Sequence, residues 1–197
     1  MKASILLSSV ALFMIFGAPV QAKDITKQFN EACAERGYGE RYCNCTLKKL
    51  SKRFRVMDTR NHPTEKRNYE STLAIITKDP AVDKAKADAV CDLHDQAKVL
   101  EVKAAKVGAT SAEKSAFTKE KLRLMQEKEN LALSYGAGNE ALQNLLHGHC
   151  VSRANYERIK LNVARDKGGI YPGLVDKMET TGNFSSLITL GSKLRCE

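Results

Sequence analysis

The chain has 197 residues, of which 32 are Lys or Arg and 23 are Asp or Glu, so its formal net charge is +9. It contains six cysteines and no tryptophan. This length favours one domain or two small coupled ones, and 43% hydrophobic residues suffice for a core. These values exclude a large multidomain enzyme, a collagen-like fibre and a protein with many membrane spans.

The first predicted element is a targeting segment over residues 1–22. Lys2 provides a positive charge, and residues 5–20 carry no charged side chain. Val20-Gln21-Ala22 then places small residues at the positions that precede a cleavage site. This order is typical of a secretory signal peptide and predicts an exported chain, periplasmic or secreted, that begins at Lys23. No later apolar run approaches the length of a membrane span, so no transmembrane segment is expected in the mature chain.

Helix signals recur along the rest of the chain, and no alternating strand pattern stands out. Ile25, Phe29 and Cys33 share one face at four-residue spacing, Pro63 predicts the end of a helix, and the glycines within residues 168–183 predict loops. The expected fold is therefore all-α, a disulfide-stapled helical bundle of about seven or eight helices. The predicted helices cover residues 24–36, 40–57, 64 to about 76, 80–107, 111–135, 140–146, 151–165 and 184–194.

The best candidate for a linker is Gly108-Ala109-Thr110-Ser111, because small and polar residues separate two helical patterns there. It divides the chain into an N-terminal helical module, residues 23–107, and a C-terminal helical module, residues 108–197. We expect the two modules to pack as one domain. The first module contains Cys33, Cys43, Cys45 and Cys91, and the second contains Cys150 and Cys196.

All six cysteines follow the predicted cleavage site, and in an exported protein an even number of cysteines predicts disulfides, here three. On a helix, Cys43 and Cys45 lie about 200° apart and so face opposite neighbours. We therefore expect one of them to pair with Cys33 and the other with Cys91, in an order that the sequence leaves open. The remaining predicted pair is Cys150 with Cys196.

The positive charge is concentrated in the second predicted helix, where six basic residues and no acid lie between Glu40 and Asp58. Such a run is usually a solvated outer face, and its functional alternative is an anion site. For an exported chain the partner would be an acidic protein, an anionic envelope polymer or a lipid headgroup, and nucleic acid is not expected. The candidate residues are Arg41, Lys48, Lys49, Lys52, Arg53 and Arg55.

Two histidines close to a cysteine raise a metal alternative. His147 and His149 precede Cys150 and are candidate metal ligands, although histidines at such positions are more often bystanders or caps. Cysteines that form disulfides do not serve as thiolate ligands, which weakens a metal site further.

The function expected from the sequence is that of an exported interaction or adaptor protein, not an enzyme, that requires no cofactor. It would bind an acidic partner or an anionic envelope component through the basic helix face. The alternatives are a metal-handling protein that uses the two histidines and a cell-wall or glycan hydrolase. The hydrolase would need two carboxylates that the sequence does not identify, and nucleophile and phosphate-loop motifs are missing from the chain.

Overall fold

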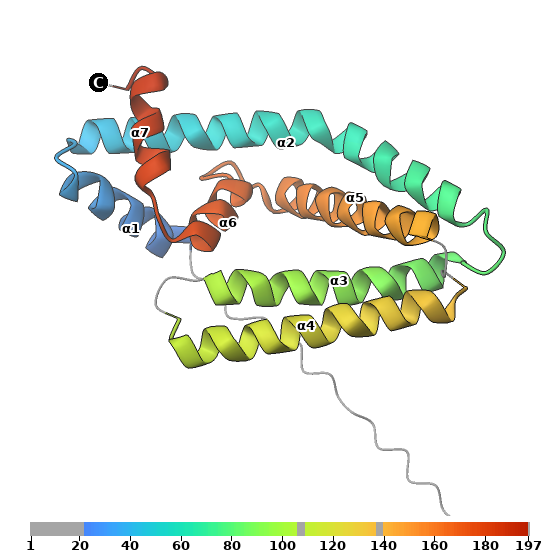
Figure 1. The fold of residues 1–197 in the computed structure, drawn as a ribbon. Helices are drawn as coiled ribbons and strands as arrows, with labels where there is room; N and C mark the ends of the chain where they lie inside the picture. The colour runs from blue at the N-terminus through green and yellow to red at the C-terminus, as the bar shows by residue number, and fades with distance from the viewer. Residues whose placement is uncertain (1–21, 106–108, 137–139, 197) are drawn as a thin grey trace, which may run out of the picture.

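The computed structural model describes residues 22–105, 109–136 and 140–196, and these residues form seven helices and no strand (Figure 1). The prediction of an all-α, disulfide-stapled bundle is therefore confirmed. The helices are α1 (Ala22–Glu35), α2 (Glu40–Ile76), α3 (Lys84–Ala105), α4 (Ser111–Ser134), α5 (Glu140–Arg165), α6 (Pro172–Thr181) and α7 (Ser185–Lys193).

Two predicted features lie outside the described residues. They are the targeting segment, of which only Ala22 is described, and the module boundary between residues 107 and 108. Among the helices in the described ranges, none combines enough length with enough apolar residues to cross a membrane.

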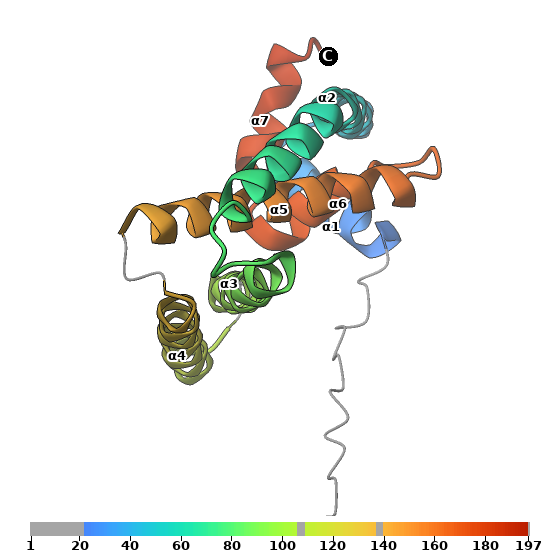
Figure 2. The same cartoon turned by 90° about the vertical axis from the view of Figure 1, so that its right-hand side faces the viewer.

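The helices bury two apolar clusters. The first joins α1, the first half of α2, α6 and α7, and includes Phe29, Leu50 and Ile188. The second joins the end of α2 with α3, α4 and α5, and includes Val90 and Leu146. α5 lies between α2 and α3, while α4 packs on α3 at the outer edge of the bundle, away from α2 (Figures 1 and 2).

The start of the chain folds as its sequence pattern predicts. Ile25, Phe29 and Cys33 on α1 are all buried, with at most 4% of each residue exposed. Gly37 has φ +82°, a left-handed conformation that ends the helix at little steric cost. The turn that follows brings Cys33 and Cys43 together in a disulfide.

α2 continues through Pro63, so the predicted break at this residue is wrong. Proline removes a backbone donor from a helix, but here contacts with α5 hold α2 on both sides of it. Before the proline, Asp58 accepts a hydrogen bond from Asn162 of α5. After it, the ring of Tyr69 stacks on Tyr156, with 5.6 Å between the centroids. α2 therefore changes direction midway instead of ending (Figure 1).

α5 joins the two helices that were predicted on either side of Gly148. The next two residues, His149 and Cys150, are fully buried, and Cys150 is bonded to Cys91 of α3. Packing of the flanking turns thus outweighs the weak helix propensity of a single glycine.

α6 occupies a stretch for which the sequence predicted only loops. It begins at Pro172, and its C-cap is Gly182 with φ +56°. A proline at the start and a glycine after the end are typical of a helix, and Leu174 and Met178 between them are fully buried. The prediction of loops over residues 168–183 is therefore wrong for this stretch, because Gly182 marks the end of a helix and not a loop without a helix.

The predicted disulfide pairing is only partly right. Cys43 pairs with Cys33, one of the two orders left open, and Cys45 faces the opposite side of α2. The predicted bond from Cys91 to this helix is wrong, and so is the predicted Cys150–Cys196 bond. α5 lies beside α3, which brings Cys150 to Cys91, whereas α7 returns to the first turns of α2, which brings Cys196 to Cys45. The other two disulfides are Cys45–Cys196, with 5.8 Å between Cα atoms, and Cys91–Cys150, with 4.9 Å.

Candidate anion-binding site

A groove of about 680 Å³ runs between the first half of α2 and the loop that connects α5 to α6. We call it the basic groove. Four of the six basic residues predicted from the sequence line it, and none of the described residues in its lining is a carboxylate. The lining residues are Cys45, Lys48, Lys49, Ser51, Lys52, Arg55, Val56, Gly168, Gly169 and Ile170.

Lys48 and Lys52 are the two cations of the groove that have no partner within the described ranges. They lie one helical turn apart on the same face of α2, and both are exposed. Neither side chain makes a hydrogen bond or an ion pair with a described residue. Two ammonium groups at this spacing repel each other, so an anion placed between them relieves the repulsion as well as binding to each.

Lys49 and Arg55 instead build the walls of the groove. Lys49 Nζ donates to the carbonyl oxygens of Leu194 and Arg195, at 2.7 and 3.1 Å, just past the end of α7. Arg55 forms a two-pronged ion pair with Asp166, at 2.6 and 3.0 Å. These hydrogen bonds from Arg55 hold the pKa of the Asp166 carboxyl below its usual value.

Arg41 and Arg53 lie outside the groove. Both are exposed on α2 and do not belong to its lining. The predicted basic face is therefore divided into three pairs. Two groove cations have no partner in the described part of the chain, two cations have structural partners, and two residues lie on the outer surface.

The α5–α6 loop is also fixed from the inside, by a polar network that sequence reasoning missed. The Tyr171 backbone N–H donates to Ser51 Oγ at 2.8 Å, and the Tyr171 hydroxyl donates to Asp58 Oδ2 at 3.0 Å. Asp58 is only 1% exposed, and Asn162 donates to the same oxygen at 3.3 Å. Gly173 permits this close packing, because a Cβ there would lie 2.8 Å from Asn162 Nδ2.

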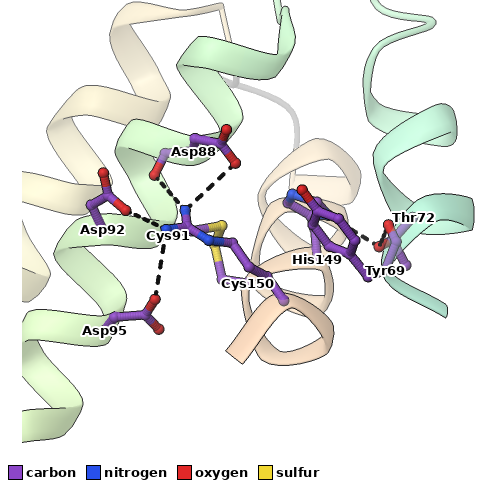
Figure 3. Close-up of a disulfide and its surroundings, with 9 residues drawn as sticks. Tyr69, Thr72, Asp88, Cys91, Asp92, Asp95, His149 and Cys150 are labelled. Atoms are coloured by element: carbon purple, nitrogen blue, oxygen red, sulfur yellow. Dashed lines mark hydrogen bonds and ion pairs between the residues drawn. A yellow bond between two sulfur atoms is a disulfide. The ribbon is translucent and has the colours of Figure 1, made fainter. Parts of the chain in front are cut away.

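The two histidines considered as metal ligands point to different neighbours. His149 is buried, its ring stacks on Tyr69 at 5.4 Å, and its Nδ1 lies 3.1 Å from Thr72 Oγ1 (Figure 3). His147 is exposed, and its ring lies 5.5 Å from that of His94 on α3. Within the described ranges, no group of three or more His, Cys, Asp or Glu side chains is placed to hold a metal ion.

The buried histidines predict a dependence of stability on pH. Burial lowers the pKa of both His94 and His149; around His149, Asp88 opposes this shift and Arg153 and Lys84 add to it. The unfolded chain thus binds protons at a higher pH than the folded chain. We expect the free energy of unfolding to fall as the pH drops below about 6.5. Urea denaturation between neutral and mildly acidic pH measures this fall in the free energy of unfolding. If the His149→Gln variant showed the same pH dependence as the native chain, His149 would not contribute to it.

Comparison of the chain with protein-family models, with curated proteins and with solved structures gave no match.

Proposed function

We propose that this chain is an exported helical binding protein that holds an anionic partner in the basic groove. The observation that carries the proposal is the pair Lys48 and Lys52. These two exposed ammonium groups have no partner among the described residues, and they lie in a groove that no described carboxylate lines. Clustered charge of one sign in a concave surface strengthens the local field and attracts ligands of the opposite sign.

Export is supported by the predicted signal peptide and by three disulfides, which form and persist in oxidising compartments. In a periplasm or outside a cell, the available partners are acidic proteins, anionic envelope polymers and lipid headgroups. All of them present phosphate or carboxylate groups, which lysine ammonium groups bind with charge-assisted hydrogen bonds.

The fixed walls of the groove favour binding over a purely solvated face. Lys49 secures the end of α7, and Arg55 secures the α5–α6 loop through Asp166 and through the carbonyl oxygen of Gly169 at 3.0 Å. Because these contacts preorganise both sides of the groove, a ligand has less conformational entropy to remove on binding.

The proposal predicts that reversing the two unpaired charges abolishes binding. Lys48→Glu combined with Lys52→Glu should weaken binding to polyphosphate, polyglutamate or phosphatidylglycerol vesicles by about 10-fold or more at low ionic strength. Fluorescence anisotropy measures binding to the two polymers, and co-sedimentation measures binding to the vesicles. Comparison of the three probes also identifies the preferred class of anion.

The matched control is Lys114→Glu combined with Lys119→Glu, which makes the same change in net charge on the exposed surface of α4. This control should retain most of the binding, and binding to the native chain should weaken as salt is added. Equal losses in both double variants would show that only net charge matters and would contradict a site in the basic groove.

A further inference from the structure

A second hollow, independent of the basic groove, lies among α3, α4 and α5. It consists of two adjoining cavities of about 360 and 170 Å³, both of which are lined by Met125, Lys128 and His147. We call it the α4 groove. Small-molecule sites in proteins are mostly of about 300 to 1,000 Å³, so the larger cavity already lies within this range.

The wall of the α4 groove is largely apolar. Leu146 and Val90 are buried on α5 and α3, and Leu93 of α3 borders the smaller cavity. On α4, Leu122 is 61% exposed and Met125 is 44% exposed, although both line the groove. Large apolar side chains that stay exposed beside a hollow are typical of a site that an apolar ligand covers.

The α4 groove also contains a cation, Lys128, that has no partner among the residues that the structure describes. Lys128 is half-buried and makes no ion pair or hydrogen bond with a described residue. The other lysines of the smaller cavity, Lys98 and Lys121, both lie near Glu101, at 3.5 and 3.1 Å. Glu129, which borders the larger cavity, is exposed. A half-buried ammonium that lacks a counter-ion favours an anionic group as its ligand.

Two histidines border the α4 groove: His147 lines both cavities, and His94 lines the smaller one. His94 is buried on α3, and its ring lies 5.5 Å from that of the exposed His147 on α5. Burial lowers the pKa of His94, and Lys128, His147 and Lys98 lower it further, while Glu101 raises it. A neutral imidazole donates one N–H, which suits an anionic oxygen, and the neighbouring ammonium disfavours a metal cation.

We propose that the α4 groove binds a long-chain fatty acid, with its carboxylate at Lys128 beside His94 and His147 and its hydrocarbon chain along Leu122 and Met125. The positive charge of Lys128 determines where the carboxylate of the fatty acid lies. The exposed apolar residues of α4 determine where its hydrocarbon chain lies. The ligand covers apolar surface that is otherwise open to water, and its carboxylate supplies the counter-ion that Lys128 lacks.

Displacement of a fluorescent fatty acid from the oxidised protein tests this proposal, with oleate and the alcohol of the same length as competitors. Lys128→Met should weaken oleate binding by about 10-fold and leave the alcohol unaffected. Leu122→Ser should weaken the binding of both oleate and the alcohol by about 5-fold, because it removes an apolar contact and leaves the charge of Lys128 in place. The matched control is Lys119→Met, an exposed lysine of α4 that does not line the groove.

Saturable oleate binding that depends on Lys128 and not on Lys119 supports the proposal. Absence of saturable binding by the native chain overturns it, and so does equal oleate affinity in the native chain and the Lys128→Met variant. The Lys48→Glu, Lys52→Glu variant should bind oleate normally, so failure of this proposal and failure of the basic groove are distinguishable.

Discussion

Replacement of Cys45 and Cys196 by alanine is expected to lower the free energy of unfolding by about 5 kcal/mol. This disulfide joins residues that are 151 positions apart in the sequence. In the loop-entropy account, a crosslink stabilises the fold by restricting the unfolded chain, and the effect grows with the length of the closed loop. Urea denaturation at fixed pH, with the slope compared between variants, measures the loss.

The matched control is the double alanine variant of Cys33 and Cys43, whose disulfide spans only 10 positions. It removes the same chemical bond from the same end of α2 and should cost about 3 kcal/mol. A larger loss from the short-loop variant than from the long-loop variant would contradict the loop-entropy explanation.

The long-range disulfide also supports the basic groove. Cys45 lines the groove, and its bond to Cys196 holds the end of the chain beside the carbonyl oxygens that Lys49 contacts. The Tyr42 hydroxyl donates to the Ile188 carbonyl oxygen at 3.0 Å and lies 3.2 Å from Ser192 Oγ, so both the middle and the last turn of α7 keep a separate attachment to α2. Loss of the disulfide should therefore loosen Arg195 and Cys196 more than α7 itself, and hydrogen exchange of their backbone amides measures this.

Local patterns in the sequence were sufficient to predict most helices. The stripe of Ile25, Phe29 and Cys33 is buried as its spacing predicts. α4 begins one residue after Thr110, whose side chain accepts a hydrogen bond from the Glu113 backbone N–H in a capping box. Such signals operate within one or two helical turns, so a single sequence displays them directly.

Contacts between distant segments could not be predicted in this way. α2 passes through Pro63 because α5 packs along it, and α7 returns to α2 instead of to α5. The concentration of charge on α2 is visible in the sequence and includes Lys48 and Lys52. The opposite wall of the groove, however, comes from Gly168 and Gly169, more than a hundred residues away. The sequence offers no signal for that meeting of segments.

Asp58 is the clearest residue that sequence reasoning missed. In the sequence it only marks the end of the basic run, yet its side chain is buried, with 1% of the residue exposed. Its Oδ2 accepts hydrogen bonds from the Tyr171 hydroxyl and Asn162 Nδ2, and its Oδ1 lies 3.7 Å from Arg158 Nη1. Burial and the adjacent Asp58 carboxylate raise the pKa of Tyr171, so its hydroxyl keeps the proton that it donates.

Asp58→Ala should therefore lower the free energy of unfolding by about 4 kcal/mol, because it leaves two buried donors without an acceptor. It should also weaken anion binding, since Tyr171 positions the α5–α6 loop of the basic groove.

Asp58→Asn is the matched control, because it preserves the shape of the side chain and one acceptor oxygen; its cost should be about 1 to 2 kcal/mol. A double-mutant cycle with Tyr171→Phe isolates the hydrogen bond itself. If that bond stabilises the loop, Tyr171→Phe should cost much less in the Asp58→Ala background than in the native chain. Strictly additive losses of unfolding free energy would mean that Asp58 stabilises the fold through Asn162 and Arg158 alone. The position of the loop would then depend on Ser51 and on the Arg55–Asp166 ion pair.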